Sequence, residues 1–212
     1  MNSPKNLRRI LKQQRKIEME IAYENEEYSN GKKVLAVLGS PRKSGYTSRL
    51  LGTLIRQFPK GTEIETVNIF ELNPTPCNAC GYCKACDGCS KKDLDEFMKN
   101  FESADVIIFA TPVYNMSVPA PLKALLDRFQ RYFEARYRRN AVPIEKKRKA
   151  VIMVTSGGDG EVGYEVVKHQ FLSLFPCLNI ELRGTMLARN TDKCGVDNTD
   201  LEKAAMLYRS VR

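Results

Sequence analysis

Five cysteines lie within thirteen residues, and two residues separate each of them from the next. They are Cys77, Cys80, Cys83, Cys86 and Cys89. Thiolates packed this densely are soft ligands, which suit zinc, Cu(I) or an iron–sulfur cluster. Ordinary packing does not need this spacing, because a small apolar side chain would fill the space without the risk of oxidation. The spacing therefore predicts a metal centre.

A polar loop, Gly39–Ser48, follows the apolar run at residues 34–38 and opens a helical pattern. The start of a helix offers unpaired N–H groups and the positive end of its dipole to an anion. Gly45 permits close approach of the backbone, and Arg42 can neutralise a phosphate. Four side chains add hydroxyl donors: Ser40, Ser44, Thr47 and Ser48. The loop lacks the three spaced glycines of a dinucleotide fingerprint and the Walker sequence, so it favours a phosphate monoester over a polar turn with a serine cap.

Two further loops follow apolar runs. The first, Ala110–Lys123, is stiffened by prolines, and its Tyr114, Asn115 and Met116 offer a flat apolar surface with a few hydrogen-bonding groups. The second, Thr155–Asp159, carries little side chain and could lie over a planar ligand. Either one alone could be an ordinary connection. Three such loops at one sheet edge predict a ligand site, because open α/β sheets bind ligands beyond the carboxyl ends of their strands.

Strand and helix patterns alternate along the chain. Apolar runs at 34–38, 106–110, 150–154 and 180–187, with a half-exposed alternation at 63–70, predict five strands. Helical spacing is found at residues 47–58, 94–101, from Pro121 onward, 162–175 and 201–211. The alternation implies a doubly wound α/β fold with a parallel sheet, and five strands fit the flavodoxin-like order 2-1-3-4-5. We expect one such domain at residues 32–212 and an amphipathic helical arm at residues 1–31.

The composition limits the function classes. The chain has 212 residues, and it contains neither an apolar run long enough to span a membrane nor the apolar core of a signal peptide. Its seven cysteines are an odd number and cluster in one loop, which disfavours a secreted disulfide framework, so we expect a cytoplasmic protein. No Ser-His-Asp pattern or carboxylate pair is visible, which argues against hydrolysis, and the single histidine, His169, is expected to be structural.

A basic stretch at residues 128–149 holds nine Lys or Arg and two Glu within a net charge of +9. Interleaved aromatic residues raise three alternatives: nucleic-acid binding, a solvated or subunit-facing helix, and docking of an acidic redox partner or an anionic cofactor. The helical spacing favours the second, with the aromatic residues facing a core and the arginines facing solvent. The apolar positions are Leu122, Leu125, Leu126, Phe129 and Phe133. Nucleic acid is therefore not expected as a partner.

Three segments together resemble the NADPH-dependent FMN reductase superfamily. They are the polar loop Gly39–Ser48, called the phosphate loop from here on, the stretch 104–129 with its Thr-Pro-Val-Tyr-Asn run before Pro-Leu-Lys, and the cysteine loop that holds Cys77 to Cys89. Within it they most resemble the iron–sulfur flavoproteins. The resemblance implies a flavodoxin-like fold, FMN held by the three loops, and homodimers or homotetramers. The residues that it implies for the FMN phosphate are Ser40, Arg42, Ser44, Thr47 and Ser48. Those that it implies for the isoalloxazine are Pro112, Val113, Tyr114, Asn115 and Met116, with Gly157, Gly158 and Asp159 on a third side.

Iron–sulfur members of the superfamily carry Cys-x2-Cys-x2-Cys-x(4–7)-Cys after the second strand. The chain resembles this pattern with a final gap of five, which leaves Cys86 surplus and implies the ligands Cys77, Cys80, Cys83 and Cys89. A 4Fe–4S cluster, zinc and free thiols are the alternatives at this loop. We expect a redox protein that passes electrons between a 4Fe–4S cluster and FMN, with NAD(P)H or a ferredoxin-like partner as donor. The alternatives are an NAD(P)H-dependent FMN or quinone reductase without a cluster, and a non-enzymatic FMN- or zinc-binding interaction module.

Overall fold

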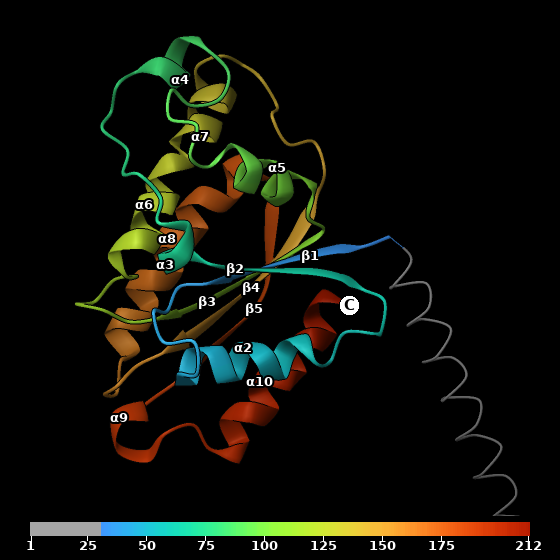
Figure 1. The fold of residues 1–212 in the computed structure, drawn as a ribbon, viewed down its shortest axis with the longest axis vertical. Coiled ribbons are helices and arrows are strands. Elements are labelled where there is room, and N and C mark those ends of the chain that lie inside the picture. The colour runs from blue at the N-terminus through green and yellow to red at the C-terminus, as the bar shows by residue number, and fades with distance from the viewer. Residues whose placement is uncertain (1–30) are drawn as a thin grey trace, which may run out of the picture.

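The computed structural model describes residues 31–212, and at its centre lies a five-stranded parallel sheet (Figure 1). The strand order is β2-β1-β3-β4-β5, which confirms the predicted flavodoxin-like order. The strands are β1 (Lys33–Leu38), β2 (Glu63–Asn68), β3 (Val106–Pro112), β4 (Arg148–Thr155) and β5 (Ile180–Ala188). The predicted N-terminal arm lies outside the described residues, apart from Gly31.

Helices cover both faces of the sheet. The helices α2 (Tyr46–Ile55) and α10 (Asn198–Val211) pack together on one face. The other face carries α5 (Asp95–Ser103), α6 (Ala120–Arg128), α7 (Gln130–Tyr137) and α8 (Glu161–Leu178). Successive residues of β1 contribute to different cores, because strand side chains alternate between faces: Val34 and Ala36 pack under α2, and Leu35 and Val37 pack under α5 and α6. Within residues 31–212, every helix is too short or too polar to cross a membrane.

Three short helices lie in the connections: α3 (Ile69–Leu72), α4 (Tyr82–Ala85) and α9 (Thr191–Cys194). The first of them corrects the strand predicted at 63–70, which ends at Asn68. The Asn68 side chain accepts a hydrogen bond from the Phe70 N–H at 2.9 Å, so it caps α3 and turns the chain out of the sheet. The helix at 162–175 is longer than predicted and ends at Leu178.

The helix predicted from Pro121 onward is two helices, α6 and α7, which meet at Phe129. The break changes which side chains face the core. Phe129 and Tyr132 are buried, but Phe133 is 45% exposed, so the prediction that Phe133 faces the core is wrong. The apolar periodicity of α6 does not continue into α7, because α7 starts a new helix.

The prediction that the arginines of the basic stretch face solvent is wrong for two of them. Arg128 and Arg148 are 3% and 2% exposed. The Arg148 guanidinium donates to the carbonyls of Phe101 and Leu178, both at 2.5 Å, and lies 4.6 Å from the centre of the Phe101 ring. Burial lowers the pKa of Arg148 to about 10. A guanidinium can be buried here because it supplies donors to carbonyl groups at or near the ends of α5 and α8.

Candidate functional site

The three polar loops meet at the carboxyl edge of the sheet, beyond β1, β3 and β4, and enclose a cavity of about 170 Å³. A further segment, which follows β5, completes its wall. The residues that line the cavity are Ser40, Arg42, Gly45, Tyr46, Thr47, Pro112, Val113, Tyr114, Thr155, Gly157, Thr191 and Asp192. Residues of all three predicted loops thus line one cavity.

Hydrogen bonds fix the three loops to one another. The hydroxyl groups of Thr47 and Thr155 lie 2.7 Å apart, which joins the start of α2 to the end of β4. The Val113 N–H donates to the Thr155 carbonyl at 2.9 Å, which joins the β3 loop to the same strand. Gly39 lies so close to α6 that a Cβ atom there would stand 2.8 Å from a methyl group of Leu122. The cavity is therefore preorganised by backbone and core contacts.

The phosphate loop presents three of its five predicted side chains to the cavity: Ser40, Arg42 and Thr47. Ser48 does not line it; its hydroxyl donates to the Arg42 carbonyl at 2.8 Å and so holds the shape of the loop. Ser44 is exposed and also lies outside the lining. The α2 helix begins at Tyr46 with Gly45 as its N-cap, so the unpaired N–H groups of its first turn lie at the cavity.

Only some of the residues predicted for the isoalloxazine line the cavity. Pro112, Val113 and Tyr114 line the cavity, whereas Asn115 and Met116 lie outside the lining. Asn115 and Met116 both have positive φ, +48° and +63°, within a tight turn that the paired backbone groups of Tyr114 and Ser117 close. Residues other than glycine rarely adopt a positive φ angle, so the turn stores backbone strain at the edge of the site.

In the third loop, Gly157 lines the cavity, and Gly158 and Asp159 do not. Asp159 instead forms an ion pair with Arg189 at 3.1 Å. Sequence reasoning missed Tyr46, Thr191 and Asp192. The available signal was topological: the segment after β5 leaves the sheet beside the end of β4, at the same edge. The Thr191 hydroxyl and N–H both donate to the Ser156 carbonyl at 3.0 Å, which fixes α9 against the third loop.

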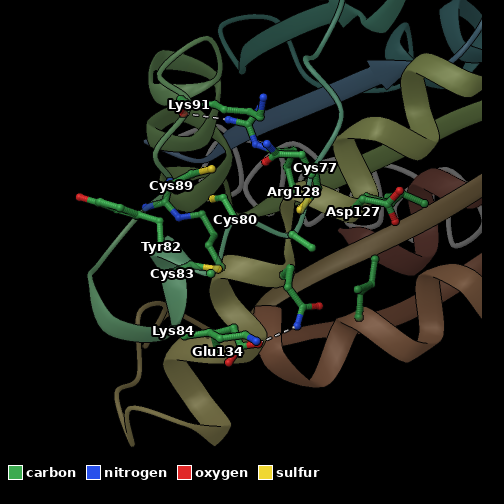
Figure 2. Close-up of a pocket in the computed structure, with 17 residues that line it drawn as sticks. Cys77, Cys80, Tyr82, Cys83, Lys84, Cys89, Lys91, Asp127, Arg128 and Glu134 are labelled. Atoms are coloured by element: carbon green, nitrogen blue, oxygen red, sulfur yellow. Dashed lines mark hydrogen bonds between the residues drawn. The ribbon is translucent and has the colours of Figure 1, made fainter.

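Four of the five cysteines in the cysteine loop line a second cavity, of about 460 Å³, between the loop and the helices α6 and α7 (Figure 2). They are Cys77, Cys80, Cys83 and Cys89; Cys86 is exposed and lies outside the lining. Burial raises the pKa of the Cys83 thiol, and Glu134 and the thiols of Cys89 and Cys77 raise it further. Hydrogen bonding to Ser90, whose hydroxyl lies 3.2 Å from the Cys80 sulfur, lowers the pKa of Cys80.

The side-chain types and the charge of this cavity suit a thiolate-bound metal group, but the placement of the side chains does not form a metal site. Among its lining residues are the cations Lys84, Lys91, Arg128 and Arg131, of which Arg128 and Arg131 already pair with Asp93 and Glu102. Lys84 and Lys91 therefore complement the negative charge that four thiolates bring. Within residues 31–212, no three His, Cys, Asp or Glu side chains are placed to hold one metal ion.

The buried side chain of Arg128 joins the two ends of the cysteine loop. Its guanidinium donates to the Thr75 carbonyl, to the Lys91 carbonyl and to a carboxylate oxygen of Asp93, each at 2.9 Å. The other oxygen of Asp93 accepts from the Thr75 N–H at 2.8 Å. Thr75 stands just before Cys77 and Lys91 just after Cys89, so one side chain of α6 closes the base of the loop. Figure 2 shows Arg128 beside Lys91.

Two more arginines of the basic stretch contact the tip of the loop. Arg139 pairs with Asp87 at 3.1 Å, and its hydrogen bond holds the pKa of that carboxyl below the usual value. The Arg131 guanidinium packs beside Gly88. The arginines of the basic stretch, which were predicted to face solvent, therefore position the cysteine loop.

Comparison with known proteins identifies the family. The profile of the NADPH-dependent FMN reductase family matches residues 32–188, and the chain belongs to this family. An iron–sulfur flavoprotein of Archaeoglobus fulgidus is 36% identical over 102 residues, which cover 47% of this chain and 46% of the relative. An iron–sulfur flavoprotein of Methanosarcina thermophila is 40% identical over 98 residues, covering 45% and 51%. The matched segments thus span about half the length of these relatives.

The fold is shared with solved structures of low sequence identity. An NAD(P)H:quinone oxidoreductase from Methanothermobacter marburgensis superposes with a TM-score of 0.63 at 17% identity, over 84% of this chain and 94% of the other. The Trp repressor binding protein from Bacillus subtilis gives a TM-score of 0.56 at 19% identity, over 82% and 96%. These likenesses confirm the flavodoxin-like architecture.

The Arg128 contacts predict a graded effect of substitution. Arg128→Ala should lower the free energy of unfolding by about 2–4 kcal/mol, because it removes three part-buried hydrogen bonds and the buried cation that pairs with Asp93. Arg128→Lys should lower it less, since one ammonium cannot span all three acceptors. Hydrogen exchange should quicken most at residues 76–90, through local opening, and in the sheet by no more than the lower free energy of unfolding accounts for. Lys147→Ala, at an exposed position of the same stretch, is the control, and unaltered exchange of the loop in Arg128→Ala would contradict the assignment.

The Asp93 contacts predict a pH dependence of stability. Burial raises the pKa of Asp93, but hydrogen bonds from the Thr75 N–H and from Arg128 outweigh it and hold the pKa below its usual value. A carboxyl with a depressed pKa stabilises the fold fully above its unfolded pKa, about 3.9, and loses this contribution as the pH falls through the folded pKa. Urea unfolding should therefore separate the parent from Asp93→Asn clearly at pH 7 and much less at pH 3. An equal difference at both pH values would refute the linkage.

Proposed function

We propose that this protein is a redox flavoprotein that passes electrons between a 4Fe–4S cluster and FMN within one chain. The observation that carries the proposal is that four thiols of one loop line a single cavity at the end of α6. The N-terminal end of α6 follows the loop after β3, which lines the cavity of about 170 Å³ at the sheet edge. That cavity is called the flavin cavity from here on. Ala120 and Arg128 are eight residues apart, so the helix spans about 12 Å between the two regions.

FMN would be held by the loops at the sheet edge. The N–H groups at the start of α2, the Arg42 guanidinium and the hydroxyls of Ser40 and Thr47 provide donors for a phosphate monoester. Pro112, Val113 and Tyr114 provide an apolar side for the ring system, and Gly157 also lines the cavity. Bound FMN accepts one or two electrons, and the chain supplies its position and its electrostatic surroundings.

The cluster would be bound by Cys77, Cys80, Cys83 and Cys89. Cys86 lies outside the cavity, which supports its assignment as a spare thiol. Between it and Cys89 the chain turns at Gly88, with φ at +81°, while Arg139 holds Asp87. This turn returns the chain to the cavity at Cys89. The cluster supplies single-electron chemistry, and the similarity to iron–sulfur flavoproteins favours it over zinc.

The electron donor that we propose is NAD(P)H or a small acidic, ferredoxin-like protein. The feature that supports a protein donor is the exposed face of α7. The helix α7 itself packs against α4 of the cysteine loop. Phe133 and Tyr137 are exposed there with their ring centres 4.8 Å apart, and Arg136 and Arg138 are exposed beside them. A cationic surface with exposed aromatic side chains suits an acidic partner. Assembly into a homodimer or homotetramer and a cytoplasmic location stay predictions.

Cofactor analysis of the protein purified without oxygen tests the proposal. Extraction should release FMN and no FAD, and the protein should contain about four iron atoms and four acid-labile sulfides per chain. Flavin without iron would favour a plain FMN or quinone reductase, and zinc in place of iron would remove the electron-transfer role of the loop.

Matched serine substitutions test the ligand assignment. Cys89→Ser should sharply lower iron and acid-labile sulfide, because it removes one of four thiolates. Cys86→Ser should leave both near the parent value, because its side chain lies outside the cavity. Cys194→Ser, at an exposed thiol outside the loop, controls for the loss of a cysteine. The opposite pattern would reassign the fourth ligand to Cys86.

A further inference from the structure

The flavin cavity has two charged side chains in its lining, Arg42 and Asp192, and their charges cancel. Within residues 31–212, neither side chain forms an ion pair or a hydrogen bond, so each charge is available to a ligand. A cavity that binds a phosphate ordinarily presents cations and N–H groups. The carboxylate of Asp192 is therefore an unexpected part of this one.

The backbone that carries Asp192 is fixed by its surroundings, and the side chain itself is exposed at the cavity. The α9 helix that carries it is held by Thr191, which bonds Ser156, and by the Asn190 N–H, which donates to the Gly158 carbonyl at 2.7 Å. A Cβ atom on Gly157 would lie 2.7 Å from the carboxyl carbon of Asp192. The φ angle of Gly157 is not positive, so the glycine is needed for room and not for its backbone conformation.

The same segment also contacts the phosphate loop. A Cβ atom on Gly195 would lie 3.4 Å from the ring of Tyr46, the first residue of α2. The segment from Asn190 to Gly195 thus bridges the third loop and the start of the phosphate-binding helix. It places the Asp192 carboxylate in the wall of the cavity where the N-terminal N–H groups of α2 lie.

We propose that Asp192 determines flavin affinity: its carboxylate weakens binding of the FMN phosphate, so that the chain holds FMN less tightly than the other donors of the cavity would allow. The proposal rests on the function proposed above, because it requires that this cavity hold the FMN phosphate. A phosphate monoester carries a charge of about −1.5 to −2 near neutral pH, so a carboxylate in the wall of the same small cavity repels it, and salt weakens this repulsion because the Asp192 side chain is exposed. Arg42 offsets this repulsion and leaves the N–H groups of α2 as the net attraction.

The competing role for Asp192 is that of a hydrogen-bond acceptor for hydroxyl groups of the ribityl chain. The two roles differ in sign. A repelling carboxylate weakens the binding of FMN and leaves riboflavin, which has no phosphate, unaffected. An accepting carboxylate strengthens the binding of both flavins.

The experiment compares Asp192→Asn with the parent in the full chain, using FMN and riboflavin as probes and flavin fluorescence as the readout. At pH 8 and low salt, Asp192→Asn should bind FMN about five- to tenfold more tightly and release it correspondingly more slowly, with riboflavin affinity unchanged. The gain should shrink at high salt, and at pH 5, where the phosphate carries less charge. Glu202→Gln removes an exposed carboxylate that is not in the lining and should leave FMN affinity unchanged.

Unchanged FMN affinity in Asp192→Asn would overturn the proposal, and so would an equal gain from Glu202→Gln, which would reduce the effect to net charge. Weaker binding of FMN and riboflavin alike would overturn it in favour of the acceptor role. If neither the parent nor the variant binds FMN, the function proposed for the cavity fails and the role of Asp192 falls with it. Failure of the Asp192 role alone leaves the parent binding FMN.

Discussion

The cysteine loop depends on the hydrogen bonds that the buried guanidinium of Arg128 donates to both of its ends. The loop between Thr75 and Lys91 has one four-residue helix, α4, and most of its residues are exposed, so an apolar core of its own does not hold it. Closing a loop of this length costs conformational entropy, and the bonds from Arg128 to both ends offset that cost. Because a buried cation is tolerated only with its partners in place, these bonds also fix the position of the loop on α6.

The same helix joins the two candidate sites. At its start, Leu122 packs against Gly39, where β1 passes into the phosphate loop, and at its end Arg128 holds the cysteine loop. A rotation or shift of α6 would therefore disturb both cavities. The rate of electron transfer between two bound groups depends on their separation, and a nine-residue helix buried along one side against the sheet would keep that separation constant.

The fold and part of the site could be predicted from the sequence, because the relevant signals are local. Apolar runs such as 34–38 and 106–110 indicate buried strands, and the polar loop after the first of them indicates an anion site. The role of Arg128 could not be predicted, since an arginine within a basic helical stretch looks solvated until the carbonyls of Thr75 and Lys91 are brought together in space. Asp192 belongs to no motif, and it reaches the cavity only because β5 lies beside β4. The exposure of Phe133 follows from the break at Phe129, which carries no Gly or Pro signal.

An anaerobic reductive titration tests the central claim, that one chain holds both FMN and an electron-accepting cluster. Reductant is added stepwise to the oxidised protein, and the absorption of flavin and cluster is followed against the equivalents consumed. FMN takes up two electrons and a 4Fe–4S cluster takes up one, so the account predicts about three electrons per chain, with the two absorptions bleaching together or in sequence. An uptake of two electrons per chain by protein with its full metal content would contradict it, because the metal would then take no part in the redox chemistry.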